Sequence, residues 1–348
     1  MHDQASLFIS IIIPTYNRCE ELEELLESLA MQTYPEERFE IVLVDDGSTD
    51  ETKALTDHFL EAHGLPIRYF YQQTQGPGPS RNLGMEKAEG DVFVFIDSDC
   101  IAPPDWLENI AAAMADGSVD AFGGPDQCRS DFPPLLKAID YSMTSFIGTG
   151  GARGTTGIKV AKYYPRSFNM GFRREVYERI GGMSNLRHGQ DMEFSNRLHR
   201  QGFHIAFLPD IGVYHKRRTS LKRFFKQIFN WGVARINLGR IDKQMLGPVH
   251  VLPALAVAFY ALVTCAALFS TSALRVWLSI TALGLVLLCF AGVQSLIRYK
   301  SIRVALLSMV TLTTQIVAYG LGFWFGVYKS ATSHSDEPIR GFTKDYYK

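Results

Sequence analysis

The most constraining feature of this chain is a series of three apolar segments in its last third. They cover residues 249–269, 274–297 and 304–328, and the whole stretch carries few charged residues. Each segment is near the ~20 residues that a helix needs to cross the hydrocarbon core of a membrane. Three such segments separated by short turns would leave a soluble protein without a polar face for water. We therefore expect three transmembrane helices rather than buried core helices.

Basic residues lie unevenly around these segments. The region 216–243 before the first segment is rich in Lys and Arg, and the loop between the second and third contains Arg298, Lys300 and Arg303. The loop between the first and second has only Arg275 beside it. Because Lys and Arg collect on the cytoplasmic side, the pattern predicts a multi-pass cell-membrane protein. Its N-terminal part would lie in the cytoplasm and its C-terminal tail outside.

The composition argues against several other classes of protein. A formal net charge of -1 does not suit a nucleic-acid binder. The five cysteines form no Cys-x-x-Cys pair, which argues against a disulfide framework or a zinc site and favours a reducing compartment. The first residues lack a basic region and a small-residue cleavage site, so we expect no signal peptide.

The N-terminal part alternates apolar, β-branched runs with helical patterns. Leucines recur at helical spacing between Leu22 and Leu29, and the capping-box pair Ser48 and Glu51 should open a second helix that Gly64 closes. This alternation predicts an α/β fold with a mainly parallel sheet and right-handed crossovers. The expected strands cover residues 8–13, 41–44, 67–71, 92–96 and 205–208, with further helices up to residue 89 and at 190–200.

Polar residues collect where the predicted strands end. Thr15 follows the first strand, Asp45 and Asp46 the second, and Asp97 and Asp99 the fourth. Ligands of open parallel sheets bind at the carboxyl ends of the strands. If residues 97–99 are extended, their two carboxylates face one pocket, and such hard oxygen ligands suit Mg²⁺ or Mn²⁺ bridging a diphosphate. The alternative is a solvated acidic turn.

Four motifs resemble one family in their order and spacing. They are SIIIPTYNR, VDDGSTD, GPGPSRNLGMEKAEG and DVFVFIDSDC, all within residues 1–110. They resemble the donor-binding half of glycosyltransferase family 2, which has the GT-A fold, and the similarity continues more loosely to about Arg240. The resemblance implies inverting transfer of a sugar from a nucleotide diphosphate donor, with Mg²⁺ or Mn²⁺ as cofactor.

The resemblance also implies roles on the nucleotide side. Pro14, Thr15 and Tyr16 would line the pocket for the base and ribose. Asp46 would accept a hydrogen bond from the base, typically uracil, which makes a UDP-sugar the expected donor. The neighbouring Asp45 could equally well bind the ligand or cap the next helix.

Further residues would contact the diphosphate and the metal. By the resemblance, Arg81 would lie near the nucleotide or diphosphate, with a surface ion pair as the competing role. Asp97 would contact the ribose or the donor sugar, and Asp99 would hold the metal. His215 would complete the metal shell or touch the diphosphate, although a single histidine is more often structural.

The segment Gly189–Glu193 resembles the acceptor-side motif of the family. The resemblance makes Asp191 the general base that removes the acceptor's hydroxyl proton, and such transfer contributes ~10²–10⁴-fold in rate. Gln190 stands where the family usually has Glu, which removes a charge beside the base. The alternative for Asp191 is capping of the helix that begins there, in which case Glu193 becomes the next candidate base.

Other residues are predicted on the acceptor side. Arg166 and Asn169 lie in a segment that resembles the strand and turn before the acceptor helix. Arg166 belongs to a group with Arg153, Lys159 and Lys162, which would hold the pyrophosphate of a lipid carrier or form a solvated basic face.

Residues 216–240 mix Lys and Arg with Phe and Trp, as is typical of a helix at a membrane interface. Gln227 and Trp231 fit loosely the QxxRW segment of processive polysaccharide synthases, but Asn230 replaces the Arg. Processive synthesis is therefore the less favoured alternative. Interfacial anchoring is the other role for Trp231.

Together these patterns predict a non-processive glycosyltransferase acting at the cytoplasmic membrane face, in cell-surface polysaccharide or glycolipid synthesis. Its partners would be a nucleotide sugar, a lipid or lipid-linked acceptor and membrane lipids. The alternatives are a processive synthase, a non-catalytic nucleotide-sugar-binding scaffold and a nucleotidyltransferase. The expected regions are a GT-A catalytic domain at 1–215 (donor half 1–110, acceptor half 111–215), an amphipathic region at 216–245, transmembrane helices at 246–330 and a polar tail at 331–348.

Overall fold

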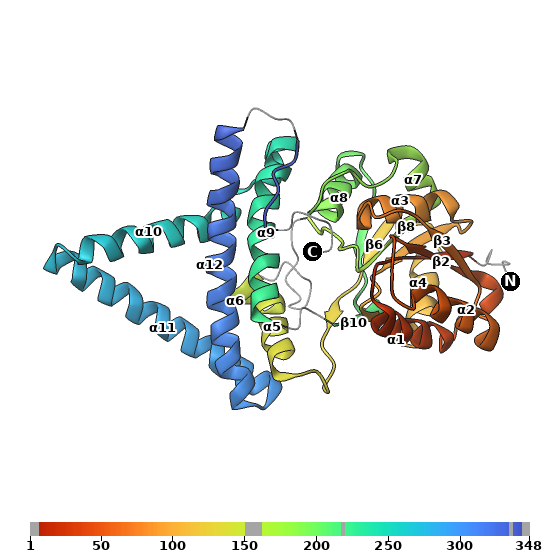
Figure 1. Cartoon of the computed structure of the whole chain (residues 1–348), viewed down its shortest axis with the longest axis horizontal. Helices are drawn as coiled ribbons and strands as arrows, with labels where there is room; N and C mark the ends of the chain where they lie inside the picture. Colours follow the sequence, from red (N-terminus) through yellow and green to blue (C-terminus); the bar gives the residue numbers. More distant parts are fainter. Residues whose placement is uncertain (1–6, 150–161, 217–219, 334–336, 343–348) are drawn as a thin grey trace. The chain divides into compact units, whose positions relative to one another are not determined.

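The protein is described here by a computed structural model that covers residues 7–149, 162–216, 220–333 and 337–342. The chain divides into two compact units (Figure 1). Of the described residues, the sheet unit takes 7–129 and 162–216, and the helical unit takes the others. Residues 130–149 thus belong with the C-terminal helices, whereas the sequence pattern grouped them with the acceptor half.

The sheet unit is built on a seven-stranded sheet with the strand order β3-β2-β1-β4-β8-β6-β9. The first four of these strands are parallel, and β8 is antiparallel to both its neighbours. The expectation of a mainly parallel sheet is therefore confirmed. The bounds are β1 (Ile9–Thr15), β2 (Phe39–Asp45), β3 (Ile67–Tyr71), β4 (Val92–Ile96), β6 (Ala121–Gly123), β8 (Asn169–Arg173) and β9 (Ile205–Phe207).

Helices cover both faces of this sheet, so its central strands are apolar at nearly every position. In β1, Ile11 and Ile13 pack on one face, while Ile12 between them packs on the other. The first face carries α1 (Cys19–Ala30), α2 (Thr52–His63) and α4 (Trp106–Met114). The second face carries α3 (Pro77–Lys87), α7 (Arg174–Ile180) and α8 (Gln190–Arg200).

The start of α2 differs from the predicted capping box. The helix begins at Thr52, and Asp50 accepts hydrogen bonds from the Thr52 backbone N–H at 3.2 Å and from its hydroxyl at 2.6 Å. The Ser48 hydroxyl instead accepts from the backbone N–H of Asn17 at 2.9 Å. The capping-box prediction was wrong, because the Ser48 hydroxyl bonds to Asn17 and Glu51, the residue before the helix, makes no side-chain capping hydrogen bond. Gly64 ends the helix with a φ of 64°, as predicted.

A second, three-stranded sheet has the order β5-β10-β7, and it brings distant segments together. Its strands are β5 (Cys100–Ile101), β7 (Asp126–Gln127) and β10 (Val213–His215). The register places His215 opposite Cys100 and Val213 opposite Asp126.

The described residues also form short 3₁₀ helices. These are η1 (Glu36–Arg38), η2 (Pro209–Ile211), η3 (Lys243–Met245) and η4 (Pro248–His250).

The helical unit is organised around one long helix, α12 (Ile302–Thr332), which runs beside α9 (Figure 1). The two approach closely because glycines face each other's backbone. A Cβ added at Gly232 would lie 2.3 Å from the Tyr319 carbonyl oxygen, and one at Gly322 would lie 2.0 Å from that of Phe229. The other helices are α5 (Pro134–Thr144), α6 (Phe146–Thr149), α9 (Leu221–Ile241), α10 (Leu252–Ala267) and α11 (Thr271–Tyr299).

Two of the three predicted membrane segments form helices that are long and apolar enough to cross a membrane. These are α11, with 29 residues, and α12, with 31. The segment 249–269 differs, because η4 takes its first residues and α10 has only 16. At about 1.5 Å per residue α10 is shorter than the ~30 Å hydrocarbon core. Three complete spans therefore stay a prediction.

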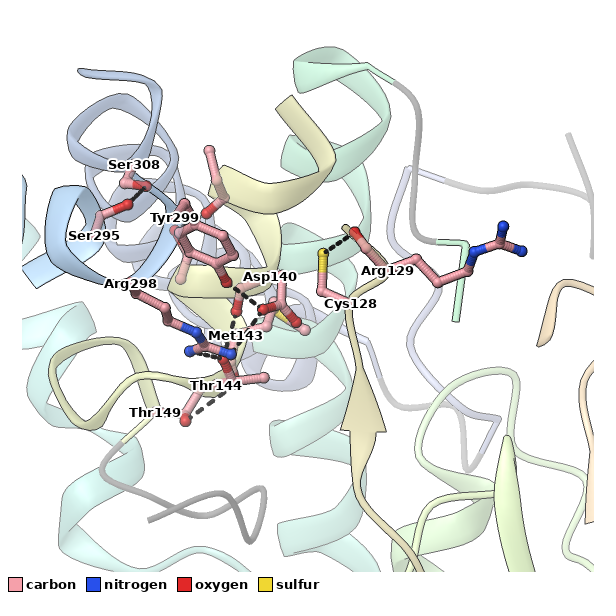
Figure 2. A network of polar contacts seen from close by, with 12 residues as sticks. Cys128, Arg129, Asp140, Met143, Thr144, Thr149, Ser295, Arg298, Tyr299 and Ser308 are labelled. Carbon is pink, nitrogen blue, oxygen red and sulfur yellow. Dashed lines mark hydrogen bonds and ion pairs between the residues drawn. The ribbon is translucent and has the colours of Figure 1, made fainter. Parts of the chain in front are cut away.

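A polar network fixes α5 to the end of α11 (Figure 2). Asp140 on α5 is 2% exposed, and its carboxylate accepts from Tyr299 and from Arg298 Nη2, the latter at 3.1 Å. Arg298 Nη1 also donates to the Thr144 hydroxyl at 2.9 Å. Arg298 and Tyr299, at the end of α11, thus both donate to the buried Asp140 carboxylate, which suits a structural connection between α5 and α11.

Candidate active site

The polar residues at the ends of β1 and β2 hold loops of the sheet unit in place. Asp46 is fully buried, and its carboxylate accepts from the Gln72 side chain and from the backbone N–H groups of Gln75 and Gly76 at 2.9 and 2.6 Å. These bonds fix the loop that leads into α3. A contact of Asp46 with the base stays a prediction, and the structure gives this residue a positioning task.

Asp45 organises the turn before α2. Its Oδ1 accepts from the Ser48 backbone N–H at 2.7 Å, and its Oδ2 accepts from the Tyr69 hydroxyl at 2.6 Å. Burial, reinforced by this contact, raises the pKa of Tyr69, so the phenol remains a donor. Asp45 therefore organises the turn after β2 and does not cap α2, which begins only at Thr52.

Residues 97–99 form a turn and not an extended strand end. β4 stops at Ile96, and the backbone N–H of Cys100 donates to the Asp97 carbonyl at 3.0 Å, which closes a β-turn. The expectation of extended alternation was wrong for this reason. The turn still places both carboxylates near Arg18. The charge of Asp99, and to a smaller extent that of Asp97, therefore raises the pKa of this arginine.

Each of these carboxylates has an arginine partner. Arg81 on α3 is buried, forms an ion pair with Asp97 and lies over the Phe95 ring. Its predicted alternative, an ion pair, is present, but in the interior. Arg18 Nη1 lies 2.8 Å from Asp99 Oδ2. Arg18 belongs to the TYNR motif, yet no local pattern assigned it a role.

The three-stranded sheet brings Asp99, Cys100 and His215 within metal-ligating range, their ligand atoms lying within 4.8 Å of one another. His215 Nε2 is 3.2 Å from Asp99 Oδ1, and its Nδ1 is 3.7 Å from Asp126 Oδ2. The His215 ring also stacks on Phe168 at 5.0 Å between centroids. Asp126 escaped the sequence analysis because only the sheet register brings it to His215.

The donor set fits a hard divalent cation held by Asp99 and His215. Burial lowers the pKa of His215, but the charge of Asp99 and contacts with Asp126 and Asp99 outweigh it and raise that pKa to about 10. His215 therefore carries a proton beside Asp99, and a divalent cation would have to displace that proton before the imidazole could ligate it. Burial raises the pKa of the Cys100 thiol, so this group stays protonated and is a poor ligand for Mg²⁺ or Mn²⁺.

The start of α8 presents Asp191 with a partly exposed side chain. Its Oδ2 lies 3.6 Å from Arg166 Nη1, and its Oδ1 accepts from the Met192 N–H at 2.9 Å. Glu193, the other candidate base, forms a two-pronged ion pair with Arg197 at 2.8 and 3.1 Å. Glu193 is thus occupied structurally, and Asp191 is the carboxylate better placed to take a proton.

Gln190 connects the start of α8 with the start of α3. A Cβ added at Gly78 would lie 2.1 Å from Gln190 Nε2, so the two helix ends are in contact. Arg81 lies on the next turn of α3 and pairs with Asp97. The Gln190 side chain therefore packs against the start of α3, the helix that carries Arg81.

The remaining predicted residues have varied surroundings. Pro14 and Thr15 are buried at the end of β1, and Tyr16 is half-buried after it. Asn169 is fully buried, donating to the Ile211 carbonyl at 2.6 Å and accepting from Trp106 at 3.2 Å, so its side chain is committed to the core.

The two QxxRW-like residues, Gln227 and Trp231, lie on α9 of the helical unit. Their acceptor role stays a prediction. In the predicted basic group, Arg153 and Lys159 lie outside the described residues.

Comparison with known proteins identifies similar chains. Residues 10–181 match the family model described as Glycosyl transferase family 2. Glycosyltransferase AglE of Haloferax volcanii is 29% identical over 257 residues, which span 74% of this chain and 80% of that protein. A dolichyl N-acetyl-alpha-D-glucosaminyl phosphate 3-beta-D-2,3-diacetamido-2,3-dideoxy-beta-D-glucuronosyltransferase of Methanococcus voltae is 24% identical over 247 residues, 66% of this chain and 73% of its own.

A solved structure shares the fold. It is the mannosyltransferase PcManGT of Pyrobaculum calidifontis in complex with GDP-Man and Mn²⁺, with a TM-score of 0.65 and 22% identity. The superposition covers 93% of this chain and 89% of that one. At this identity the likeness concerns the fold alone.

Proposed function

Since this chain belongs to glycosyl transferase family 2 and has the GT-A fold, we propose that it transfers a sugar from a nucleotide diphosphate donor to a lipid-linked acceptor, with inversion at the anomeric carbon. The observation that carries the proposal is the convergence of charged groups in the sheet unit. Asp97 and Asp99 each pair with an arginine, Asp99 also faces His215, and Asp191 lies partly exposed beside Arg166 at the start of α8.

In this mechanism Asp99 and His215 would hold a divalent cation, Mg²⁺ or Mn²⁺. When bound, the cation supplies positive charge to the diphosphate leaving group. Arg81, already buried beside Asp97, contributes a second fixed positive charge at the same strand end. Asp126 behind His215 orients the imidazole so that Nε2 faces Asp99.

Asp191 acts as the general base on the acceptor hydroxyl. Its carboxylate takes the proton, the hydroxyl oxygen forms a bond to the anomeric carbon, and the bond from that carbon to the diphosphate oxygen breaks. The nucleoside diphosphate leaves with the electron pair, and attack from the opposite side inverts the configuration. Arg166, 3.6 Å from Asp191, would bind an anionic group of the acceptor.

Two observations favour a lipid-linked acceptor at a membrane. The helices α11 and α12 are long and apolar enough to span one, and α11 leaves most of its apolar side chains exposed in the helical unit. The name of the Methanococcus voltae relative specifies a dolichyl phosphate sugar as its acceptor. We propose a multi-pass protein whose sheet unit faces the cytoplasm, following the distribution of Lys and Arg.

A donor screen tests the proposed reaction. The full chain, purified in detergent with Mn²⁺, is given UDP-, GDP- and dTDP-sugars together with a polyprenyl-phosphate-linked sugar, and released nucleoside diphosphate is measured. We expect one donor class to give acceptor-dependent release, with UDP-sugars proposed first from Asp46. Absence of acceptor-dependent release with every donor would contradict the proposed activity.

Labelling of introduced cysteines tests the membrane arrangement. With the native cysteines replaced, a single cysteine at Ser333 in intact cells should react with a membrane-impermeant reagent if the chain crosses three times. Protection at Ser333, together with labelling after cell lysis, would require an even number of spans. In that case the short α10 would not cross.

A further inference from the structure

Both carboxylate oxygens of the proposed metal ligand Asp99 already contact cationic or basic side chains. His215 Nε2 lies 3.2 Å from Oδ1, and Arg18 Nη1 lies 2.8 Å from Oδ2. Arg18 is neither on the sheet nor on the acceptor helix, but immediately precedes α1. An incoming cation therefore meets the Arg18 guanidinium on one side of its ligand.

We propose that Arg18 is a placeholder cation on Asp99, which a divalent metal must displace and which then turns to the donor diphosphate. This inference rests on the proposed function, because it takes Asp99 as the metal ligand. A guanidinium and a metal ion on the same carboxylate repel each other in a partly buried site. Arg18 therefore lowers the affinity for the metal alone and makes tight metal binding depend on the donor.

The local backbone places Arg18 for this task. Asn17 has a φ of 50°, in the left-handed region that Asn tolerates better than most residues. Its side chain holds this turn by accepting from the Thr49 backbone N–H at 2.7 Å, and its own N–H donates to Ser48 at 2.9 Å. The turn thus ties the approach to α1 to the loop after β2 and directs the next residue towards Asp99.

Arg18 also has a weaker second partner in the adjoining helix α1. Glu21, one turn into α1, has its carboxylate 3.7 Å from Arg18 Nη1, against 2.8 Å for Asp99. When Asp99 takes a metal ion, the guanidinium keeps one acidic neighbour and gains the diphosphate as a bidentate acceptor.

Direct measurement of Mn²⁺ binding tests this inference without turnover. The full chain in detergent is titrated with Mn²⁺ by electron paramagnetic resonance, first without nucleotide and then with GDP or UDP. We expect Arg18→Gln to bind Mn²⁺ about five- to tenfold more tightly than the parent without nucleotide. The gain in Mn²⁺ affinity that nucleotide gives the parent should shrink in this variant. Unchanged or weaker Mn²⁺ binding by Arg18→Gln would overturn the inference.

Two controls separate this effect from others. Arg38→Gln makes the same change of charge at an exposed position in η1, and it should leave Mn²⁺ affinity unchanged. Equal tightening in Arg38→Gln would mean a general charge effect and would also overturn the inference. Asp99→Asn tests the metal site itself. Parent-like Mn²⁺ binding by that variant would refute the proposed metal ligand, whereas lost binding with no effect of Arg18→Gln would refute the placeholder alone.

Discussion

In the sheet unit Asp97 and Asp99 pair with arginines just after the end of the central strand β4, whereas in the helical unit Asp140 pairs with Arg298 between helices. The first two carboxylates are 31% and 12% exposed, and Asp140 is 2% exposed. The same pair of residue types therefore has different consequences. Where ligand can reach the carboxylate, the arginine is a partner that can be exchanged, and where it cannot, the pair connects helices.

The largest effect is expected from removing the proposed base. Asp191→Asn keeps a residue that can cap α8 but cannot take a proton, so kcat should fall about 10²–10⁴-fold. The melting temperature and the affinities for donor and Mn²⁺ should stay close to those of the parent. Steady-state kinetics measures kcat, and calorimetry measures the melting temperature and the two affinities. Near-normal kcat would make Asp191 a cap and not the base.

Loss of the metal ligand should have the next largest effect on activity. Asp99→Asn removes a carboxylate that faces His215, and we expect turnover to fall about 10²-fold or more. Excess EDTA should stop the parent, and added Mn²⁺ or Mg²⁺ should restore it. Asp57→Asn, at an exposed ion pair on α2, is the matched control. Full activity of the parent in EDTA would refute metal dependence.

In the helical unit the corresponding change should affect stability rather than chemistry. Arg298→Gln leaves the buried Asp140 carboxylate without its charged partner, which should lower the free energy of unfolding by about 1–3 kcal/mol. Arg303→Gln removes the same charge from an exposed position of α12 and should change stability little. Thermal unfolding in detergent compares the two. Equal melting temperatures would show that the pair is dispensable.

The smallest effect is expected at Glu193. Glu193→Gln weakens the two hydrogen bonds from Arg197 and should cost about 0.5–1.5 kcal/mol of stability. Its kcat should remain within about threefold of the parent, because this carboxylate is held by Arg197 and takes no proton. Kinetics at a temperature well below unfolding checks this. A loss of kcat as large as that of Asp191→Asn would transfer the role of base to Glu193.

The strands that apolar and aromatic runs mark could be predicted closely from the sequence. β3 and β4 have the predicted bounds because their side chains report directly which faces are covered. The start of α2, the turn at residues 97–100 and the short α10 could not be predicted. In each case the outcome depends on competing hydrogen bonds or on a local turn that composition does not specify.

The candidate site was predictable where motifs mark it. The residues Asp97, Asp99, Arg81 and Asp191 belong to such motifs, and the structure brings Arg81 onto Asp97. The contact of Asp126 with His215 and the contact of Arg18 with Asp99 were not predictable, because each joins chain segments far apart in the sequence. Pairing across a sheet register is a tertiary fact that no local pattern carries.

The anomeric configuration of the product tests the central claim most directly. The purified chain, a nucleotide sugar of known configuration and a lipid-linked acceptor are incubated with Mn²⁺, and the new glycosidic bond is assigned by NMR. A single base on the acceptor hydroxyl with in-line displacement predicts an inverted configuration, formed by the parent and lost in Asp191→Asn. A product with retained configuration, or one formed equally by Asp191→Asn, would contradict the account.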